Sequence, residues 1–375
     1  MSDIMPSSLP DIKQQLIEEK AKKTREQSPL DTIQSTATID PANPATIDIK
    51  FRPSKHAAFM QAAKVHTPKY KFYVEVGGDP THPAIVLIMG LGAQSLVWPN
   101  EFCYALINAG FRVVRFDNRD IGKSSKLKHK KLTQAHNSPI YKAKLLGRFG
   151  LGLPLKNLQT PYDLYDMAED AYQLLKMLGI KKYFVIGQSM GGMIAQIMAV
   201  RYPHQVEKLG LLSTSNNRPF SRPPAIEAIK AFTQPLPKSQ DADALTQQFV
   251  QTIKTIASPD YFDEQAALSK AKKLFKRRFY PKGTQRQLLA ILATGSLVDI
   301  NKQIYQPTLI IHGKQDKLIP FSHAYSLAKH IAHSQLILID ELGHDMPLAL
   351  TEQLASQFIA HFSYNAQINW LWCEN

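Results

Sequence analysis

The stretch from Tyr183 to Val200 constrains this chain most. An apolar strand leads through Gly-Gln-Ser-Met-Gly into an apolar run that is compatible with a helix. A Gly-x-Ser-x-Gly sequence between a strand and a helix is typical of a nucleophile elbow, in which the serine hydroxyl stands clear of the sheet. Such a turn strains the backbone at Ser189 and crowds the residues two before and two after it, so only Gly187 and Gly191 fit there. We therefore expect Ser189 to be a nucleophile.

Two backbone amides are expected to stabilise negative charge beside this serine. The amide of Met190 would lie at the N-terminus of the following helix, a position that favours an oxyanion. A second amide is expected from the loop after the apolar strand 84–89, which continues as Gly90-Leu91-Gly92. We assign this second role to the amide of Leu91. Many such loops carry histidine where this chain has Met89, but the amide does not depend on that side chain.

The chain from residue 70 onward alternates between strands and helices. Continuous apolar runs such as 84–89 are expected of strands that are buried on both faces. The alternation predicts an α/β fold with a mostly parallel central sheet and helices on both faces. Strands are predicted over 70–76, 84–89, 111–116, 183–186, 209–212, 307–313 and 335–340, and helices over 96–109, 162–178, 323–333 and 350–362.

Two segments interrupt this alternation. Residues 126–161 are long for a connection between a strand and a helix, and residues 216–305 carry helical patterns of their own. An insertion with its own helices between consecutive strands is expected to cover the carboxyl edge of the sheet, where ligands bind. The helices of this insertion are predicted over 225–232, 243–256 and 264–275. The expected organisation is an N-terminal arm, partly extended or mobile (1–67), a core (68–215 and 306–363), a helical cap insertion (216–305) and a C-terminal tail (364–375).

Ser189 needs partners, because a serine is a poor nucleophile unless a general base takes its proton and an acid orients that base. Downstream, Asp316 follows the predicted strand 307–313, and His344 follows the predicted strand 335–340. All three residues would then lie in loops at one edge of one sheet, in the chain order serine, acid, histidine that this architecture uses. The spacing therefore predicts a Ser-His-Asp triad.

Other polar residues near these positions have weaker claims. Asp345 and Glu341 are alternative acids for His344, although the side chains of adjacent residues usually diverge. His312 precedes a glycine at a strand end and is interpreted as a structural hydrogen-bonding residue. The histidines on or beside the predicted helix 323–333 are expected to face solvent; they are His323, His330 and His333.

Several motifs together resemble the α/β-hydrolase superfamily over roughly residues 70–362. They are Met89-Gly90-Leu91-Gly92, the D-x-R-x-x-G-x-S pattern from Asp117 to Ser124, the elbow Gly187–Gly192 and the loops of Asp316 and His344. The chain as a whole resembles bacterial carboxylesterases and the aclacinomycin methylesterase group. The resemblance implies an α/β-hydrolase fold with Ser189 as nucleophile, His344 as general base, Asp316 as its orienter, and the amides of Leu91 and Met190 as oxyanion donors. It assigns Asp117 and Arg119 to holding loops.

The expected reaction follows from the serine at the elbow. Haloalkane dehalogenases and most epoxide hydrolases of this fold need an aspartate there and are excluded. The expected enzyme is a serine hydrolase that cleaves a small-molecule or lipid-like carboxylic ester through an acyl-enzyme, with His344 activating the water that releases the acid. Two alternatives stay open. One is a carbon-carbon bond hydrolase or perhydrolase with the same triad, and the other is a non-catalytic ligand-binding module on the same fold.

The composition, 44% hydrophobic and 20% charged with a net charge of +14, is that of a globular protein with basic surfaces. The lysines between 123 and 144 and the basic run 270–278 are interpreted as solvated faces. No recognised binding module accompanies this charge, so no nucleic-acid partner is expected. A further hypothesis is that the apolar stretch 145–155 flanks the site and makes a weak contact with an anionic membrane surface or a long acyl chain.

The cysteines and the N-terminus give further expectations. Cys103 and Cys373 are far apart and lack metal-ligand spacing, so we expect no disulfide framework, no metal and no cofactor. Residues 1–20 lack the pattern of a signal peptide, and no apolar run approaches the roughly 18 residues of a membrane span. We therefore expect a cytoplasmic protein.

Overall fold

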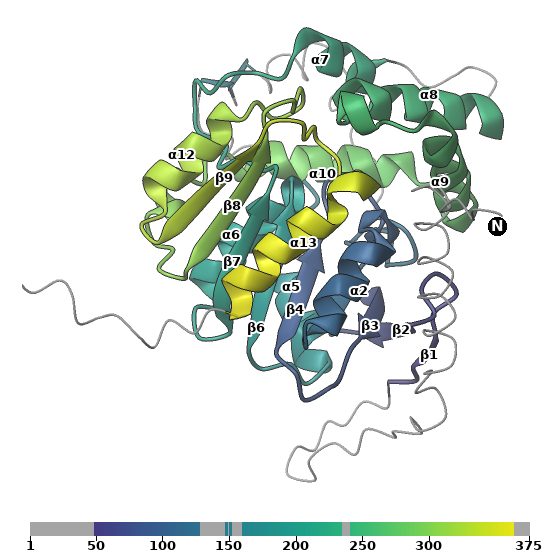
Figure 1. Cartoon of the computed structure of the whole chain (residues 1–375), viewed down its shortest axis with the longest axis vertical. Coiled ribbons are helices and arrows are strands. Elements are labelled where there is room, and N and C mark those ends of the chain that lie inside the picture. Colours follow the sequence, from purple (N-terminus) through teal and green to yellow (C-terminus); the bar gives the residue numbers. More distant parts are fainter. Residues whose placement is uncertain (1–48, 128–146, 149, 152–159, 235–240, 364–375) are drawn as a thin grey trace, which may run out of the picture. The chain divides into compact units, whose positions relative to one another are not determined.

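The central sheet of the computed structural model carries the strands in the order β1-β2-β3-β5-β4-β6-β7-β8-β9. The structure describes residues 49–127, 147, 148, 150, 151, 160–234 and 241–363, all within one compact unit, Ile49–Asn375 (Figure 1). Strands β4 to β9 pair in parallel, and β1, β2 and β3 add an antiparallel edge that joins β5. The described strands are β1 (Arg52–Pro53), β2 (Met60–His66), β3 (Lys71–Gly77), β4 (Ala84–Ile88), β5 (Arg112–Phe116), β6 (Tyr183–Gln188), β7 (Val206–Leu212), β8 (Thr308–Gly313) and β9 (Ser334–Ile339).

Helices cover both faces of this sheet, which explains the continuous apolar runs of its central strands. In β4, Val86 and Ile88 face one hydrophobic core with α5 (Leu164–Met177), α6 (Met190–Arg201) and α12 (Ser322–His330). Ile85 and Leu87 face the other core, with α2 (Asn100–Asn108) and α13 (Leu348–Ser363). Figure 1 shows α2 and α13 crossing the near face of the sheet. The predicted mostly parallel sheet with helices on both faces is confirmed.

The segment 216–305 is largely helical where it is described. Figure 1 shows α7, α8 and α9 grouped together at one end of the sheet. The described elements are α7 (Ile226–Thr233), α8 (Ala242–Ile256), η2 (Pro259–Tyr261), α9 (Glu264–Arg277), α10 (Pro281–Thr294) and α11 (Val298–Asn301). The sequence pattern predicts α7, α8 and α9 within a few residues. It does not predict α10, which has Pro281 in its first turn and carries Gly283 against the carbonyl of Asp120.

Two further elements differ from the sequence-based expectation. The predicted helix 96–109 is interrupted, because η1 (Ser95–Val97) ends before Pro99 and α2 begins after it. A residue that precedes proline is disfavoured in a helical conformation. The strand β2 lies inside the range expected as an arm, and it pairs with β3 along its full length. Its sequence, Met-Gln-Ala-Ala-Lys-Val-His, carries few of the branched and aromatic residues that signal a strand.

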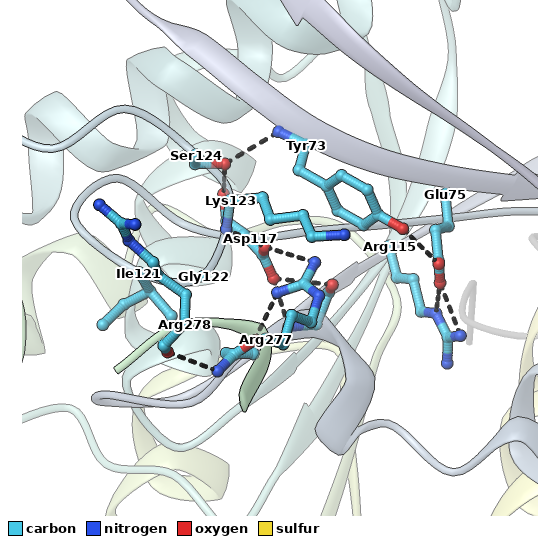
Figure 2. Close-up of polar contacts among 12 residues, drawn as sticks. Tyr73, Glu75, Arg115, Asp117, Ile121, Gly122, Lys123, Ser124, Arg277 and Arg278 are labelled. Atoms are coloured by element: carbon cyan, nitrogen blue, oxygen red, sulfur yellow. Dashed lines mark hydrogen bonds and ion pairs between the residues drawn. The ribbon is translucent and has the colours of Figure 1, made fainter. Parts of the chain in front are cut away.

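A buried ion pair ties the antiparallel edge to the parallel strands. Arg115 on β5 lies 2.6 Å from Glu75 on β3, and both side chains are fully buried (Figure 2). Glu75 also accepts hydrogen bonds from Ser54 and Tyr73. Burial disfavours the charged form of Glu75, but the attraction of Arg115 and these hydrogen bonds outweigh it and lower the pKa of the carboxyl. The carboxylate is therefore ionised and fully paired.

Removal of Arg115 should be strongly destabilising, because it leaves the buried charge of Glu75 unpaired. Arg115→Met is expected to lower the free energy of unfolding in urea by about 3 to 5 kcal/mol. The control is Lys182→Met, which removes an exposed partner of Glu207 and should cost less than about 1 kcal/mol. Equal losses in the two variants would contradict the assignment of Glu75 and Arg115 as a structural pair.

Candidate active site

Ser189 forms the turn between β6 and α6 with φ 55° and ψ −123°. Such a conformation costs a non-glycine residue about 1 to 3 kcal/mol, so the surroundings must enforce it. The neighbouring glycines show how: a Cβ at Gly187 would lie 2.3 Å from the Gly191 carbonyl oxygen, and one at Gly191 would lie 2.0 Å from that of Ile88. No side chain larger than glycine fits at either position, as the sequence motif suggested.

A continuous chain of hydrogen bonds links Ser189, His344 and Asp316. Ser189 Oγ lies 3.0 Å from His344 Nε2, and His344 Nδ1 lies 2.7 Å from Asp316 Oδ2. Asp316 sits in the loop after β8 and His344 in the loop after β9. The side chains of both residues are almost fully buried, with 7% of His344 exposed and none of Asp316. The structure thus brings together the three residues that the spacing selected.

The loop that carries His344 reaches Ser189 by crossing the end of β8. A Cβ at Gly313, the last residue of β8, would lie only 2.0 Å from the carbonyl oxygen of Leu342. The two backbones can approach this closely because residue 313 is glycine. The crossing carries His344 past Asp316 and toward the elbow, so the imidazole lies between the carboxylate and the hydroxyl.

Asp316 is held as a carboxylate. Its Oδ1 accepts hydrogen bonds from the amides of Leu318 (2.9 Å) and Ile319 (2.7 Å), while His312 Nε2 lies 3.3 Å from its Oδ2. Burial disfavours the charged form, but attraction to His344 and hydrogen bonds from His312 and His344 outweigh it and lower the pKa of Asp316 to about 2. An ionised Asp316 favours the tautomer of His344 in which Nδ1 carries the proton and Nε2 is free to accept one.

The other candidates have different partners. Asp345 accepts from the amide and hydroxyl of Ser258, 2.9 and 2.6 Å away, and Glu341 is exposed. His312 bonds the carbonyl of Ile319 through Nε2, in keeping with a structural role. The expectation that His323 faces solvent is wrong: its Nδ1 bonds Ser215 Oγ and its Nε2 bonds the Arg222 carbonyl, each at 2.8 Å.

The two expected amide donors belong to segments that meet at the elbow. Met190 is the first residue of α6, where a helical amide has no intrahelical acceptor. The loop of Leu91 passes close to Ser189, since a Cβ at Gly90 would lie 3.0 Å from Ser189 Cβ. Asn118 Nδ2 anchors the start of this loop through a 2.9 Å hydrogen bond to the carbonyl of Met89.

One residue of the helical segment 216–305 holds the end of the same loop. The sequence pattern does not predict it. The buried side chain of Gln287 on α10 accepts from the amide of Gly92 and donates to the carbonyl of Arg119, each at 2.9 Å. No local sequence signal marks Gln287, because its partners lie more than 160 residues away.

Two buried ion pairs join the same helical segment to the loop after β5. Arg286 pairs with Asp120 at 2.8 Å. Arg277 pairs with Asp117 at 2.7 Å (Figure 2). The interpretation of the basic run 270–278 as solvated is therefore wrong for Arg277, whose side chain is only 2% exposed. Asp117 also accepts from the amide and hydroxyl of Ser95, so it holds a loop, as the resemblance implied.

Some expectations fall on parts of the chain that are not described. Of the stretch 145–155, the structure describes only residues 147, 148, 150 and 151, so its contact with lipid stays a prediction. The tail 364–375 and the first 48 residues also lie outside the described residues. Within the described ranges, no group of three or more His, Cys, Asp or Glu side chains could hold a metal ion. None of the described helices has the length and apolar character needed to cross a membrane.

Comparison with known proteins decides the family. A family model described as alpha/beta hydrolase fold matches residues 83–348 of this chain. The chain belongs to the alpha/beta hydrolase fold family. The expected family and fold are therefore confirmed.

The relatives of this alpha/beta hydrolase include named esterases. Rhodomycin D methylesterase of Streptomyces peucetius is 25% identical over 307 residues, which cover 76% of this chain and 92% of that protein. Pimeloyl-[acyl-carrier protein] methyl ester esterase of Nitrosomonas europaea is 28% identical over 183 residues, 48% of this chain and 71% of that protein. The solved enol-lactonase from Burkholderia xenovorans shares the fold, with a TM-score of 0.60 and 19% identity over 80% of this chain and 100% of that chain. The family and its named relatives identify the chain as a hydrolase.

The ionised Asp316 should give stability a specific acid dependence. Its pKa in the folded protein is about 2, below the ordinary value of 3.8. A carboxyl whose pKa is lowered by folding stabilises the protein above its ordinary pKa, and this contribution is lost as the pH falls through the folded value. We expect the difference in unfolding free energy between wild type and Asp316→Asn to shrink as the pH falls between about pH 4 and 2. Urea denaturation at each pH measures it, and a constant difference down to pH 2 would contradict the lowered pKa.

Proposed function

We propose that this alpha/beta hydrolase cleaves carboxylic esters through a covalent acyl-enzyme on Ser189. The observation that carries the proposal is the chain of hydrogen bonds from Ser189 Oγ through His344 to Asp316. This order supplies a nucleophile, a general base for its proton and a carboxylate that orients the base and stabilises its charged form. The esterase relatives support the choice of an ester as the substrate.

The proposed first step is acylation. His344 Nε2 takes the proton of Ser189 Oγ as the oxygen attacks the ester carbonyl, and the carbonyl oxygen becomes an oxyanion. The amides of Leu91 and Met190 would donate hydrogen bonds to this oxyanion, from the loop after β4 and from the first turn of α6. The imidazolium then returns the proton to the alcohol oxygen as the carbon-oxygen bond breaks, so the alcohol departs and the acyl group remains on Ser189.

Deacylation repeats this sequence with water as the nucleophile. His344 takes a proton from water, and the resulting hydroxide attacks the acyl carbon. The second tetrahedral intermediate collapses when His344 donates the proton to Ser189 Oγ, which releases the carboxylic acid and restores the enzyme. No cofactor or metal ion is needed for either half-reaction.

The organisation of the chain around this site is part of the proposal. We assign 216–305 as a cap, because Arg277, Arg286 and Gln287 connect it to the loops beside the elbow. The proposed substrate is a small-molecule or lipid-like ester that enters between the cap and the core. From the sequence we also propose a cytoplasmic location and a weak contact with an anionic membrane surface.

A fluorophosphonate probe, which reacts with activated serines, tests the proposal directly. Wild type should be labelled at Ser189, and Ser189→Ala should lose the label together with hydrolysis of p-nitrophenyl esters. His344→Ala should lower kcat by about 10³-fold or more, because the serine loses its base. Ser356→Ala, which changes an exposed serine on α13, is the matched control and should be labelled like wild type.

Three results would contradict this assignment. A wild type that neither reacts with the probe nor hydrolyses any p-nitrophenyl ester would favour a ligand-binding module on the same fold. Labelling that survives in Ser189→Ala would place the reactive serine elsewhere. Hydrolysis of a carbon-carbon bond with no turnover of esters would leave the proposed triad in place but would show that the substrate is not an ester.

A further inference from the structure

Ser258, just beyond the end of α8, joins the helical segment to the loop that carries His344. Its hydroxyl accepts a hydrogen bond from the amide of Gly343 (2.8 Å) and donates one to Asp345 Oδ1 (2.6 Å). Its amide donates to the same carboxylate oxygen at 2.9 Å. Ser258 is completely buried, so no water competes for these bonds. One serine thus holds the residue before His344 and the residue after it.

The backbone of His344 is held from the same side. Its amide donates a 2.7 Å hydrogen bond to the carbonyl of Ile256, the last residue of α8. The two chains are in close contact, since a Cβ at Gly343 would lie 2.5 Å from the backbone of Ala257 and of Ser258. Residues 343 to 345 are therefore each bonded to the segment 256–258. A loop whose backbone is held at three successive residues loses most of its conformational freedom.

These contacts give a role to a partly buried carboxylate that the proposed mechanism does not use. Asp345 is not part of the hydrogen-bond chain at His344, because Nδ1 of that histidine bonds Asp316. Burial raises the pKa of Asp345, while the two hydrogen bonds from Ser258 act in the opposite direction. Asp345 instead accepts hydrogen bonds from Ser258, and the hydroxyl of Ser258 in turn accepts one from the amide of Gly343. These hydrogen bonds link the Asp345 side chain to the backbone of Gly343.

We propose that Ser258 and Asp345 form a positioning pair that fixes the imidazole of His344 between Asp316 and Ser189. This inference rests on the proposed function, because it concerns the general base of that reaction. The pair acts only through the backbone on either side of His344 and does not touch the reacting atoms. A displacement of a catalytic group by about 1 Å can cost as much as 100-fold in rate. The helical segment would therefore contribute to catalysis itself as well as to covering the site.

Kinetics of matched variants test the pair. Ser258→Ala removes both hydroxyl bonds and is expected to lower kcat by about 10- to 100-fold, with KM changed by less than about twofold. Asp345→Ala should behave in the same way. Asp345→Asn should retain most of the activity, because its amide oxygen can still accept both bonds from Ser258. This rescue by the conservative variant would not be expected if any change at Asp345 merely weakened the fold.

The control is Ser54→Ala. Ser54 is also a buried serine that bonds a carboxylate, Glu75, and accepts from backbone amides. Ser54 contacts β3. Two strands, β5 and β4, lie between β3 and β6, the strand that leads to Ser189. Ser54→Ala should lower stability and leave kcat unchanged. A loss of kcat in Ser54→Ala equal to that in Ser258→Ala would overturn the proposal, as would wild-type kinetics in Ser258→Ala.

A second readout does not depend on turnover. In protein labelled with ¹⁵N-histidine, the Nδ1 proton that His344 shares with Asp316 should give a resonance at low field, because the bond is short and charge-assisted. This resonance should broaden or vanish in Ser258→Ala and persist in Ser54→Ala and Asp345→Asn. An unchanged resonance in Ser258→Ala would refute the positioning role. A wild type that shows the resonance and hydrolyses no ester would instead refute the proposed function.

Discussion

The packing of backbone around Ser189 is the constraint on which the site depends. The register of β4 and β6 aligns Ile88 with Gly187, so the chain that leaves β4 passes directly beside the elbow. Glycine at 187 and 191 lets three backbone segments meet with no room for a side chain. The strained conformation of Ser189 is therefore enforced by its neighbours, and its hydroxyl is aimed at His344. The same packing brings the Gly90 loop against the serine, so one set of contacts positions both the proposed nucleophile and the loop of a proposed oxyanion donor.

The distance between strands is the second constraint on the site. Ser189 follows β6 and His344 follows β9, while β7 and β8 lie between them in the sheet. A histidine at the end of its own strand would be too far from the serine, since neighbouring strands lie about 4.8 Å apart. The close crossing at Gly313 brings the loop of His344 back over β8, and the contacts with Ser258 hold the loop as well. Asp316, in the loop after β8, lies beside this crossing and bonds the imidazole of His344.

The sequence predicted what depends on local pattern and missed what depends on contacts between distant segments. Ser189 could be found because its turn needs glycine at fixed offsets, and Asp316 and His344 because each follows a strongly apolar strand. The sheet was predictable for the same reason, except for β2, whose alanines and polar residues give a weak strand signal. Ser258 and Gln287 could not be found, because ordinary polar residues on helical segments acquire their roles only when the fold brings them to the two loops. The burial of Arg277 depends in the same way on Asp117, 160 residues earlier in the chain.

In the proposed site, the hydroxyl of Ser189, the imidazole of His344 and the amides of Leu91 and Met190 converge on one reacting carbonyl group. A crystal structure of the enzyme after reaction with a phosphonate ester tests this convergence most directly, since the adduct imitates the tetrahedral intermediate. We expect phosphorus bonded to Ser189 Oγ, with its non-ester oxygen about 3 Å from both amides and His344 Nε2 within hydrogen-bonding distance of Oγ. An adduct on another residue, or an oxygen that points away from both amides, would contradict it.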